Sequence, residues 1–413
     1  MTTRSDVRTR WAEVDGAHPG PLAGLRVIDA GTMIAGPFAA TLLGDYGASV
    51  IKIEKPRVGD PMRQWTPMKE GLSLWWKVTA RNKRLVTLDL ASEAGRRLFL
   101  ELAECADVVV ENFRPGTFER WGLGYDVLSE RNPGLVLLRV SGYGQTGPYR
   151  ERPGYGTAAD ALSGIPSFTG FPDGPPVLPA FPLADTLAGS FGVIGALSAL
   201  RERQSSGRGD EVDVSLYEPL FRLAESQVIA FDQLGLVKQR RGNRLEEDSP
   251  RNAYSTADGE WIAISASSDR TFERLARAIG RPELANDEKF ATNPTRIAHA
   301  DELDGVVGSW IGERSADEVL RIFDAHDVVA ARVYDITDIF RDQHYAARED
   351  VVEVPDGDFG TVRMPTVVPR FLRNACSVRR SGGALGEDND AVFRGILGLS
   401  EADVEQLAAE GVI

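Results

Sequence analysis

The strongest constraint on the fold is a series of short apolar runs that alternate with helical segments through the first part of the chain. The runs are rich in Val, Ile and Leu, which is typical of strands buried on both faces of a parallel sheet. They span residues 25–31, 49–54, 84–90, 107–113 and 134–144. Because parallel strands need crossover connections, the alternation predicts an α/β doubly wound, Rossmann-like large domain.

The segments between the runs carry helix signals. Residues 32–48 are expected to form a turn and a helix, and residues 92–106 form an amphipathic pattern with Ser92 as the expected N-cap. A further strand is expected at 211–216, followed by a helix to about Gly235. Ligands in doubly wound folds bind beyond the carboxyl ends of the strands, so the segments that follow the runs are the expected binding region.

A charged, Gly- and Pro-containing segment at 237–251 is the expected domain boundary. We therefore expect a large domain over residues 1–236 and a smaller α/β domain over 237–350. The latter should contain a hairpin on an Asp258-Gly259 turn and helices at about 269–280, 294–313 and 315–326, the last with a Ser315/Glu318 capping box. A second hairpin (351–365) and two helices complete the chain, and residues 1–20 are expected to be a polar arm.

Charge and composition exclude several classes of function. A net charge of −14 argues against a nucleic-acid partner. No run of about 18 apolar residues is present, so no membrane-spanning segment is expected. Two cysteines, Cys105 and Cys376, and four histidines without ligand spacing predict neither a disulfide framework nor a metal site. These features favour a cytoplasmic protein without a permanently bound cofactor.

Asp185 lies between an extended Pro-containing stretch and a helix of small and apolar residues. Apolar side chains cover most of this helix, so it is expected to be buried. Gly189, Gly192 and Gly195 leave one side of it without side chains, where another segment or a ligand could approach closely. Asp185 is at the position expected for the N-cap. A buried helix N-terminus also favours an anion, so the same position would suit a carboxylate nucleophile. The residue pattern allows both roles.

Two features of the first 84 residues suggest nucleotide binding without proving it. Basic residues and three tryptophans are mixed over 55–84, which suits either a phosphorylated adenine nucleotide or a solvated surface. Glu54 follows Gly31 at about the distance at which dinucleotide folds keep a ribose-binding acid. The turn is Gly31-x4-Gly36, however, which is not the G-x-G-x-x-G pattern, so the nicotinamide signal is weak.

The motif GFPDGPP (170–176), followed by D-x3-G-x5-G from Asp185, resembles the family III CoA-transferases, the group that includes formyl-CoA and carnitine CoA-transferases. The resemblance implies an interlocked homodimer in which the chain returns to the first domain at its end. It also implies that Asp185 is the covalent nucleophile of an enzyme whose substrates are an acyl-CoA and a carboxylic acid.

The same resemblance implies which residues contact CoA. The implied phosphate-binding residues are Lys55, Arg114 and Arg120, and those implied to line the nucleotide and pantetheine are Met33, Leu88, Asn112 and Phe113. Tyr143 lies in a further CoA-contacting segment, GYGQTGP. Because acyl transfer passes through oxyanions, backbone N–H donors are needed, and the amides around Met33 and Ile34 are the expected ones.

Departures from the family pattern bear on the reaction. Ile34 stands where formyl-CoA transferase has a glutamine, and the family's active-site glycine run has no counterpart in 237–251, which argues against a formyl/oxalate substrate pair. An α-methylacyl-CoA racemase of the same fold is the first alternative. Its second base is a histidine where this chain has Tyr155 and Gly156. A nicotinamide oxidoreductase or a non-catalytic nucleotide-binding protein is the second alternative.

The only sequence features that bear on the identity of the donor and acceptor carboxylic acids are charged side chains. Five arginines could pair with a second carboxylate and so favour a short dicarboxylic donor such as succinyl-CoA, but they equally suit a solvated surface. They are Arg152, Arg240, Arg241, Arg244 and Arg251. An intramolecular shift of CoA within one dicarboxylic acid is also compatible with the sequence.

Overall fold

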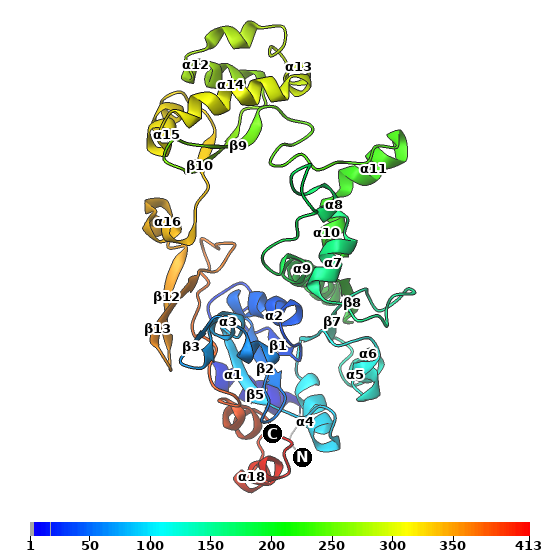
Figure 1. The fold of residues 1–413 in the computed structure, drawn as a ribbon. Coiled ribbons are helices and arrows are strands. Elements are labelled where there is room, and N and C mark those ends of the chain that lie inside the picture. Colours follow the sequence, from blue (N-terminus) through cyan, green and yellow to red (C-terminus); the bar gives the residue numbers. More distant parts are fainter. Residues whose placement is uncertain (1–3, 17) are drawn as a thin grey trace. The chain divides into compact units, whose positions relative to one another are not determined.

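The computed structural model describes residues 4–16 and 18–413, which form two compact units (Figure 1). Unit 1 consists of the described residues up to Ile165 together with Leu178–Val228 and Ala347–Ile413. Unit 2 consists of Pro166–Val177 and Ile229–Ala346. Residues 166–177, which the sequence analysis assigned to the large domain, join unit 2 because Gly170 and Gly242 form a β-bridge.

Unit 1 is built on a six-stranded parallel sheet with the strand order β5-β2-β1-β6-β7-β8. These strands are β5 (Lys83–Thr87), β2 (Ser49–Glu54), β1 (Arg26–Asp29), β6 (Val108–Glu111), β7 (Val136–Ser141) and β8 (Glu211–Ser215). They coincide with the apolar runs and with the expected strand at 211–216. The order reverses between β1 and β6, so the doubly wound fold is confirmed and its switch point lies there.

Alternating side chains of the strands bury two separate cores. Ile28, Ile51 and Val109 pack with α1 (Arg4–Asp15), α4 (Glu93–Ala103), α5 (Thr117–Arg120), α6 (Tyr125–Arg131), the π-helical turn η3 (Ala391–Ile396) and α18 (Glu401–Ala409). Val27 and Val108, on the opposite face, pack with α2 (Ala35–Asp45), α7 (Gly156–Leu162), α9 (Leu183–Ser206) and α10 (Glu218–Leu223). The period of two along each strand therefore produces a three-layer arrangement.

The N-terminal segment is a helix and not the expected polar arm. In α1, Val7 and Trp11 lie one turn apart and both are buried, with Trp11 only 1% exposed. The Trp11 indole N–H donates to the hydroxyl oxygen of Ser49 at 2.6 Å. Two apolar residues on one helical face are enough to dock a helix whose other positions are polar. Residues 1–3 and 17 of the expected arm lie outside the described residues.

Helix α9 packs closely on α2 and β7 through its glycines. A Cβ on Gly189 would lie 2.8 Å from the carbonyl oxygen of Ala35, and one on Gly192 would lie 3.0 Å from the Leu138 side chain. The expectation of a helix buried all round is wrong, because Ile194 is 60% exposed in the single chain. By length and composition alone α9 could cross a membrane, but core helices of soluble proteins pass the same test.

The last part of the chain completes unit 1. The backbone N–H groups of Leu85 and Thr87 donate to the side chains of Asp388 and Asn389, each at 2.8 Å. A hairpin of β12 (Val351–Asp356) and β13 (Gly360–Pro365) forms where it was expected. Of the two helices expected at the end, the first is the π-helical turn η3, and α18 begins after the cap residue Ser400.

Unit 2 contains a three-stranded antiparallel sheet in the order β11-β10-β9, covered by helices. The strands β9 (Arg251–Ser255) and β10 (Trp261–Ser265) form the expected hairpin, and β11 (Ala330–Arg332) pairs with β10. The main helices are α12 (Asp269–Ala278), α13 (Asn293–Ala298), α14 (Ala300–Gly312) and α15 (Ala316–Ala325). The helix expected at 294–313 is broken at His299. Ser315 caps α15 by accepting from the Glu318 N–H.

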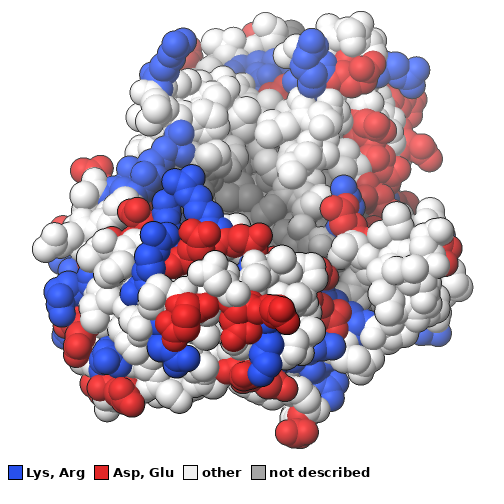
Figure 2. Space-filling view, turned by 90° about the horizontal axis from the view of Figure 1, so that it is seen from above, with Lys and Arg blue, Asp and Glu red and all other residues white. Residues whose placement is uncertain are grey.

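The remaining elements are short. They are η1 (Pro61–Gln64), β3 (Met68–Lys69), β4 (Leu72–Ser73), α3 (Leu74–Thr79), α8 (Ile165–Phe168), α11 (Glu225–Leu234), η2 (Pro282–Asn286), α16 (Ile336–Arg341) and α17 (Gln343–Ala347). The helix expected up to Gly235 is thus divided into α10 and α11. On the face drawn in Figure 2, acidic and basic side chains are interspersed, so the excess of acidic groups does not form one continuous surface there.

Candidate active site

Asp185 lies in the first turn of α9, three residues after the N-cap residue Pro182. The expectation that Asp185 is itself the N-cap is therefore wrong, and no side chain caps this helix. Its carboxylate is half-buried, and burial, followed by the negative charge of Asp160, raises its pKa to about 6. A poorly solvated carboxylate that is still mostly ionised at neutral pH is suited to nucleophilic attack.

Gly156 lies next to this carboxylate. It is the first residue of α7, and a Cβ added there would lie 2.2 Å from Oδ2 of Asp185. Any side chain at this position would have to displace the carboxylate. The absence of a side chain at Gly156 therefore leaves the space that the Asp185 carboxylate occupies.

Asp160 is a second carboxylate beside Asp185 that the sequence analysis missed. It lies one helical turn after Gly156 on α7, is only 6% exposed, and accepts a hydrogen bond from the backbone N–H of Ala184. Its Oδ1 is buried and has no hydrogen-bond partner among the described residues. The sequence contains a signal for Asp160: it follows Gly156 by four residues, which places both on the same face of a helix.

The turn after β1 is held by a network of buried charges. The backbone N–H of Met33, which has a φ of 64°, donates to Oδ1 of Asp60 at 3.1 Å. Asp60 in turn pairs with Lys52 at 3.1 Å, and Lys83 pairs with Asp29 at 2.8 Å. The Met33 amide, one of the two expected oxyanion donors, is therefore already bound to a carboxylate in this structure.

Asn112 joins the turn after β1 to the end of β6. Its side-chain oxygen accepts from the Thr32 N–H at 2.7 Å, and its side-chain nitrogen donates to the Thr32 carbonyl at 2.8 Å. Both ends of the amide are thus used within the protein. Asn112 lies at the switch point of the sheet, where it shapes the binding region.

A cavity of about 330 Å³ opens beyond the carboxyl ends of β1, β2, β5 and β6. Three of the predicted CoA-binding residues line it, namely Lys55, Leu88 and Phe113. Sequence reasoning missed Trp121, which lines the same cavity and packs edge-on against Phe113 with ring centroids 5.0 Å apart. The lining also includes three acidic residues, Glu54, Asp60 and Asp89, of which the first two are paired with Arg63 and Lys52. Walls that combine apolar and charged side chains suit a ligand that has both apolar and charged parts.

The other predicted residues lie around this region and do not line the cavity. Ile34 is buried against Met62 and Trp76, and Tyr143 is half-buried in the turn after β7. Arg114 and Arg120 are exposed in the segment after β6, and Arg120 donates to the Thr117 hydroxyl at 2.8 Å. Among the described residues, Lys55, Arg114 and Arg120 form no ion pair, so their charges are available to an anionic ligand.

Glu54 does not have the free carboxylate that a ribose-binding acid needs. Arg63 donates to both of its oxygens, at 2.6 and 2.7 Å, and the Asp60 N–H donates to one of them at 2.9 Å. The Arg63 guanidinium also stacks on Trp76 at 3.9 Å from the ring centroid. These contacts favour a structural role for this part of the basic segment 55–84 over nucleotide binding.

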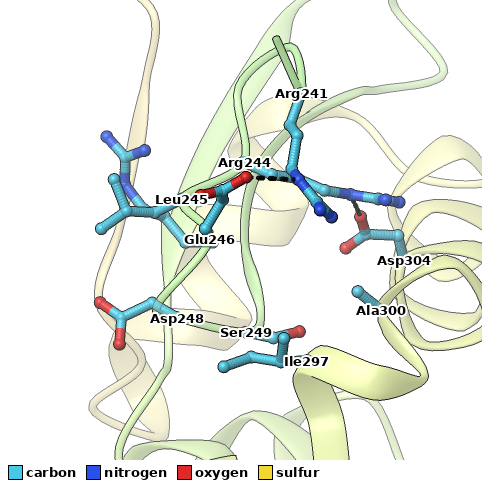
Figure 3. Close-up of a pocket in the computed structure, with 10 residues that line it drawn as sticks. Arg241, Arg244, Leu245, Glu246, Asp248, Ser249, Ile297, Ala300 and Asp304 are labelled. Atoms are coloured by element: carbon cyan, nitrogen blue, oxygen red, sulfur yellow. Dashed lines mark hydrogen bonds and ion pairs between the residues drawn. The ribbon is translucent and has the colours of Figure 1, made fainter. Parts of the chain in front are cut away.

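The arginines of the segment 237–251 are engaged within unit 2. Arg241 pairs with Glu246 at 3.0 Å, and Arg244 pairs with Asp304 at 2.6 Å, around a small pocket (Figure 3). Arg244 also pairs with Asp301 at 2.5 Å. Two further arginines donate to backbone carbonyls: Arg240 to those of Ser167, Phe171 and Gly174, and Arg251 to that of Asn243. This segment is organised by its own charges.

Buried polar atoms without partners mark the segment from β7 to α7. Besides Asp160, these are the Ser141 hydroxyl and the Gln145 side-chain nitrogen. Such atoms are rare in native structures and are usually satisfied by water or ligand. In the described part of the chain, no group of three or more His, Cys, Asp or Glu side chains could hold a metal ion.

Comparison with known proteins agrees with this geometry. The model of the family described as CoA-transferase family III matches residues 22–389. The chain is 44% identical to the succinyl-CoA–D-citramalate CoA-transferase of Chloroflexus aurantiacus, over 96% of this chain and 98% of that protein. It is 46% identical to the beta subunit of the succinyl-CoA–L-malate CoA-transferase of the same organism, over 95% of this chain and 98% of that subunit.

A solved structure shows the same fold. A CaiB/BaiF family protein from Brucella suis matches with a TM-score of 0.81 and 31% sequence identity. The match covers 92% of this chain and all of that one.

Proposed function

The chain belongs to CoA-transferase family III, and we propose that it moves CoA between carboxylic acids through a covalent intermediate on Asp185. The proposal rests on one observation above the others. Asp185 presents a half-buried carboxylate, with a pKa raised to about 6, beside Gly156 of α7. A carboxylate held in this way is desolvated enough to attack and remains ionised at neutral pH.

The first half of the reaction loads CoA onto the enzyme. A carboxylate oxygen of Asp185 attacks the thioester carbonyl, CoA leaves as a thiolate, and a mixed anhydride forms between the acyl group and Asp185. The thiolate then attacks the Asp185 carbonyl carbon of the anhydride. The donor acid leaves as a carboxylate, and an aspartyl-CoA thioester remains on the enzyme.

The second half reverses these steps with the acceptor acid. The acceptor carboxylate attacks the carbonyl carbon of the aspartyl-CoA thioester, the CoA thiolate leaves, and a second mixed anhydride forms between the acceptor acid and Asp185. Attack of the thiolate on the acceptor's acyl carbon gives the new acyl-CoA and restores the Asp185 carboxylate. No net proton transfer and no oxidation or reduction is needed, so we propose that the enzyme works without a permanently bound cofactor.

The acyl-CoA is proposed to bind at the carboxyl ends of the strands. The cavity lined by Lys55, Leu88 and Phe113 suits an apolar and charged ligand, and Arg114 and Arg120 add unpaired positive charge after β6. Arginine side chains bind phosphate groups in a bidentate manner, which fits the several phosphates of CoA. A short dicarboxylic donor such as succinyl-CoA is proposed because succinyl-CoA appears in the names of similar proteins.

The active form is proposed to be a cytoplasmic homodimer. Helix α11 has no buried residue in the single chain, and its apolar side chains Ile229, Phe231 and Leu234 are each at least 60% exposed. A helix with large exposed apolar side chains is typical of an interface. A second copy of the chain would cover them.

Covalent trapping tests the nucleophile. Intact-protein mass after incubation with succinyl-CoA and hydroxylamine, followed by peptide mapping, should show a hydroxamate on the peptide that contains Asp185. Asp185→Ala should lose the adduct and reduce CoA transfer by at least about a thousandfold, as expected when a covalent nucleophile is removed. CoA binding should persist in this variant.

Asp173→Ala is the matched control, because Asp173 is an exposed aspartate in the nearby GFPDGPP motif. It should keep both the adduct and the activity. Transfer by Asp185→Ala within about tenfold of the wild-type rate would contradict the assignment of Asp185.

A further inference from the structure

The loop between β7 and α7, residues 142–155, carries an arginine whose guanidinium has no acidic partner among the described residues. Arg152 stacks on the ring of Tyr149 at 3.6 Å from its centroid, and Tyr149 packs edge-on against Tyr143. A guanidinium stacked by its face keeps its N–H groups directed outward at its edge, where they can bind a planar anion.

Backbone contacts hold this loop in place. The Gln145 N–H donates to Asp213 of β8 at 2.8 Å, and the Arg152 N–H donates to the Tyr149 carbonyl at 2.8 Å. A Cβ on Gly154 would lie 3.1 Å from the Tyr143 ring, so the end of the loop packs against its beginning. The Tyr149–Arg152 pair is therefore presented by an ordered loop, which lowers the entropic cost of binding.

The loop ends at the nucleophile. Gly156, which contacts the Asp185 carboxylate, follows Arg152 by four residues. Four residues of extended chain span at most about 14 Å, and a long arginine side chain can cover much of that distance. A group bound to Arg152 can therefore be part of a small molecule that reacts at Asp185.

The five arginines suggested by the sequence are thus separated by the structure. Arg240, Arg241, Arg244 and Arg251 belong to unit 2 and are engaged with carbonyls or carboxylates there. Only Arg152 belongs to unit 1, which contains Asp185. In the same loop the Gln145 side-chain nitrogen is buried and has no hydrogen-bond partner in the described part of the chain, so it is a donor that a polar ligand would satisfy.

We propose that Arg152, held by Tyr149, binds the distal carboxylate of a dicarboxylic substrate whose other carboxyl group reacts at Asp185. This inference rests on the proposed function. It gives the enzyme a means of selecting dicarboxylic over monocarboxylic acyl groups of the same length. A site built to pair a charge discriminates strongly against a ligand that lacks it, because the partner group is then left unpaired.

The test compares two thioesters that differ in the distal carboxylate. Single-turnover loading of Asp185 from succinyl-CoA and from butyryl-CoA is followed by hydroxamate trapping and intact mass, using the full chain. Arg152→Ala should slow loading from succinyl-CoA by about ten- to hundredfold, which is the range for a lost hydrogen bond to a charged group. Loading from butyryl-CoA should change by less than about twofold, since its acyl group offers nothing for Arg152 to bind.

Arg150→Ala is the control in the same loop, because Arg150 is exposed and pairs with Glu151 at 3.3 Å. It should leave both rates unchanged. Equal losses of loading rate for the two thioesters in Arg152→Ala would show that Arg152 contributes to CoA binding or to folding. No loss for either thioester would show that Arg152 does not contribute to loading. Either result overturns the inference alone. A wild-type protein that forms no adduct from either thioester overturns the proposed function, and the inference with it.

Discussion

At the scale of single residues, two neighbours define the surroundings of the Asp185 carboxylate. Gly156 leaves room for its carboxylate, and Asp160 adds a negative charge beside it. Burial and the like charge both disfavour the ionised form, so both raise the pKa of Asp185. A less solvated carboxylate is a stronger nucleophile, but it also becomes protonated at a higher pH.

The loading rate should therefore fall as the pH is lowered through about 6, because only the ionised carboxylate attacks. Below that pH the rate should drop about tenfold per unit, as expected when one group must lose one proton. The pH profile of single-turnover loading from an acyl-CoA, measured between pH 4.5 and 8, checks this.

Asp160→Asn should move this acid limb to lower pH, because it removes the negative charge and keeps the shape of the side chain. The fold should be unaffected, since an amide oxygen can still accept from the Ala184 N–H. The same profile, recorded for the variant beside the wild type, measures the shift. An unchanged or higher apparent pKa would show that Asp160 does not act on Asp185 through its charge.

At the scale of elements, helix α9 places Asp185, the proposed nucleophile, through close packing. Its glycines let the helix axis approach α2 and β7, and Asp185 projects from its first turn. Glycine is a poor helix former but allows such contacts. The position of Asp185 therefore depends on residues that have no chemistry of their own.

Gly189→Ala should destabilise the protein by about 1–3 kcal/mol, because its Cβ would lie 2.8 Å from the carbonyl oxygen of Ala35. Thermal and urea unfolding measure the change. The control is Gly305→Ala in α14, where nothing lies within 4 Å of the added Cβ.

Gly305→Ala should be neutral or stabilise the protein by about 0.5–1 kcal/mol through helix propensity. Equal effects of the two substitutions would contradict the packing explanation for Gly189. A stable Gly189→Ala protein would do the same.

At the scale of the whole molecule, the single chain leaves apolar surface exposed on α9 and α11. Ile194 of α9 is 60% exposed, as is Phe231 of α11, and Leu234 is 71% exposed. Large apolar side chains that face water on a helix favour association. The exposed side chains of each helix are the physical basis for the proposed homodimer.

Sedimentation velocity at micromolar concentration should therefore give the mass of a dimer for the wild-type protein. The double substitution Phe231→Asp and Leu234→Asp should shift the population toward monomer, because buried unpaired carboxylates are strongly disfavoured at an interface. Lys238→Ala is a control that removes a nearby polar side chain paired with Glu247. A monomeric wild-type protein would contradict the proposal.

The sequence by itself determined the sheet and the nucleophile candidate. Buried parallel strands are almost continuously apolar, so the strands of unit 1 could be located to within a few residues. The motif around Asp185 was sufficient to indicate the family. Local signals were also sufficient for the caps at Ser92 and Ser315 and for the turn at Asp258-Gly259, since each depends on residues only a few positions apart.

Only the tertiary structure decided which distant residues meet. The proximity of Asp160 to Asp185, the use of the Met33 amide by Asp60, and the assignment of residues 166–177 to unit 2 all depend on contacts between segments far apart in the chain. The pairing of the four arginines of unit 2 with carboxylates and carbonyls also depends on such contacts. So does the lack of an acidic partner for Arg152 among the described residues. Periodicity and capping are encoded locally, whereas the pairing of charges depends on how packed elements are placed in space.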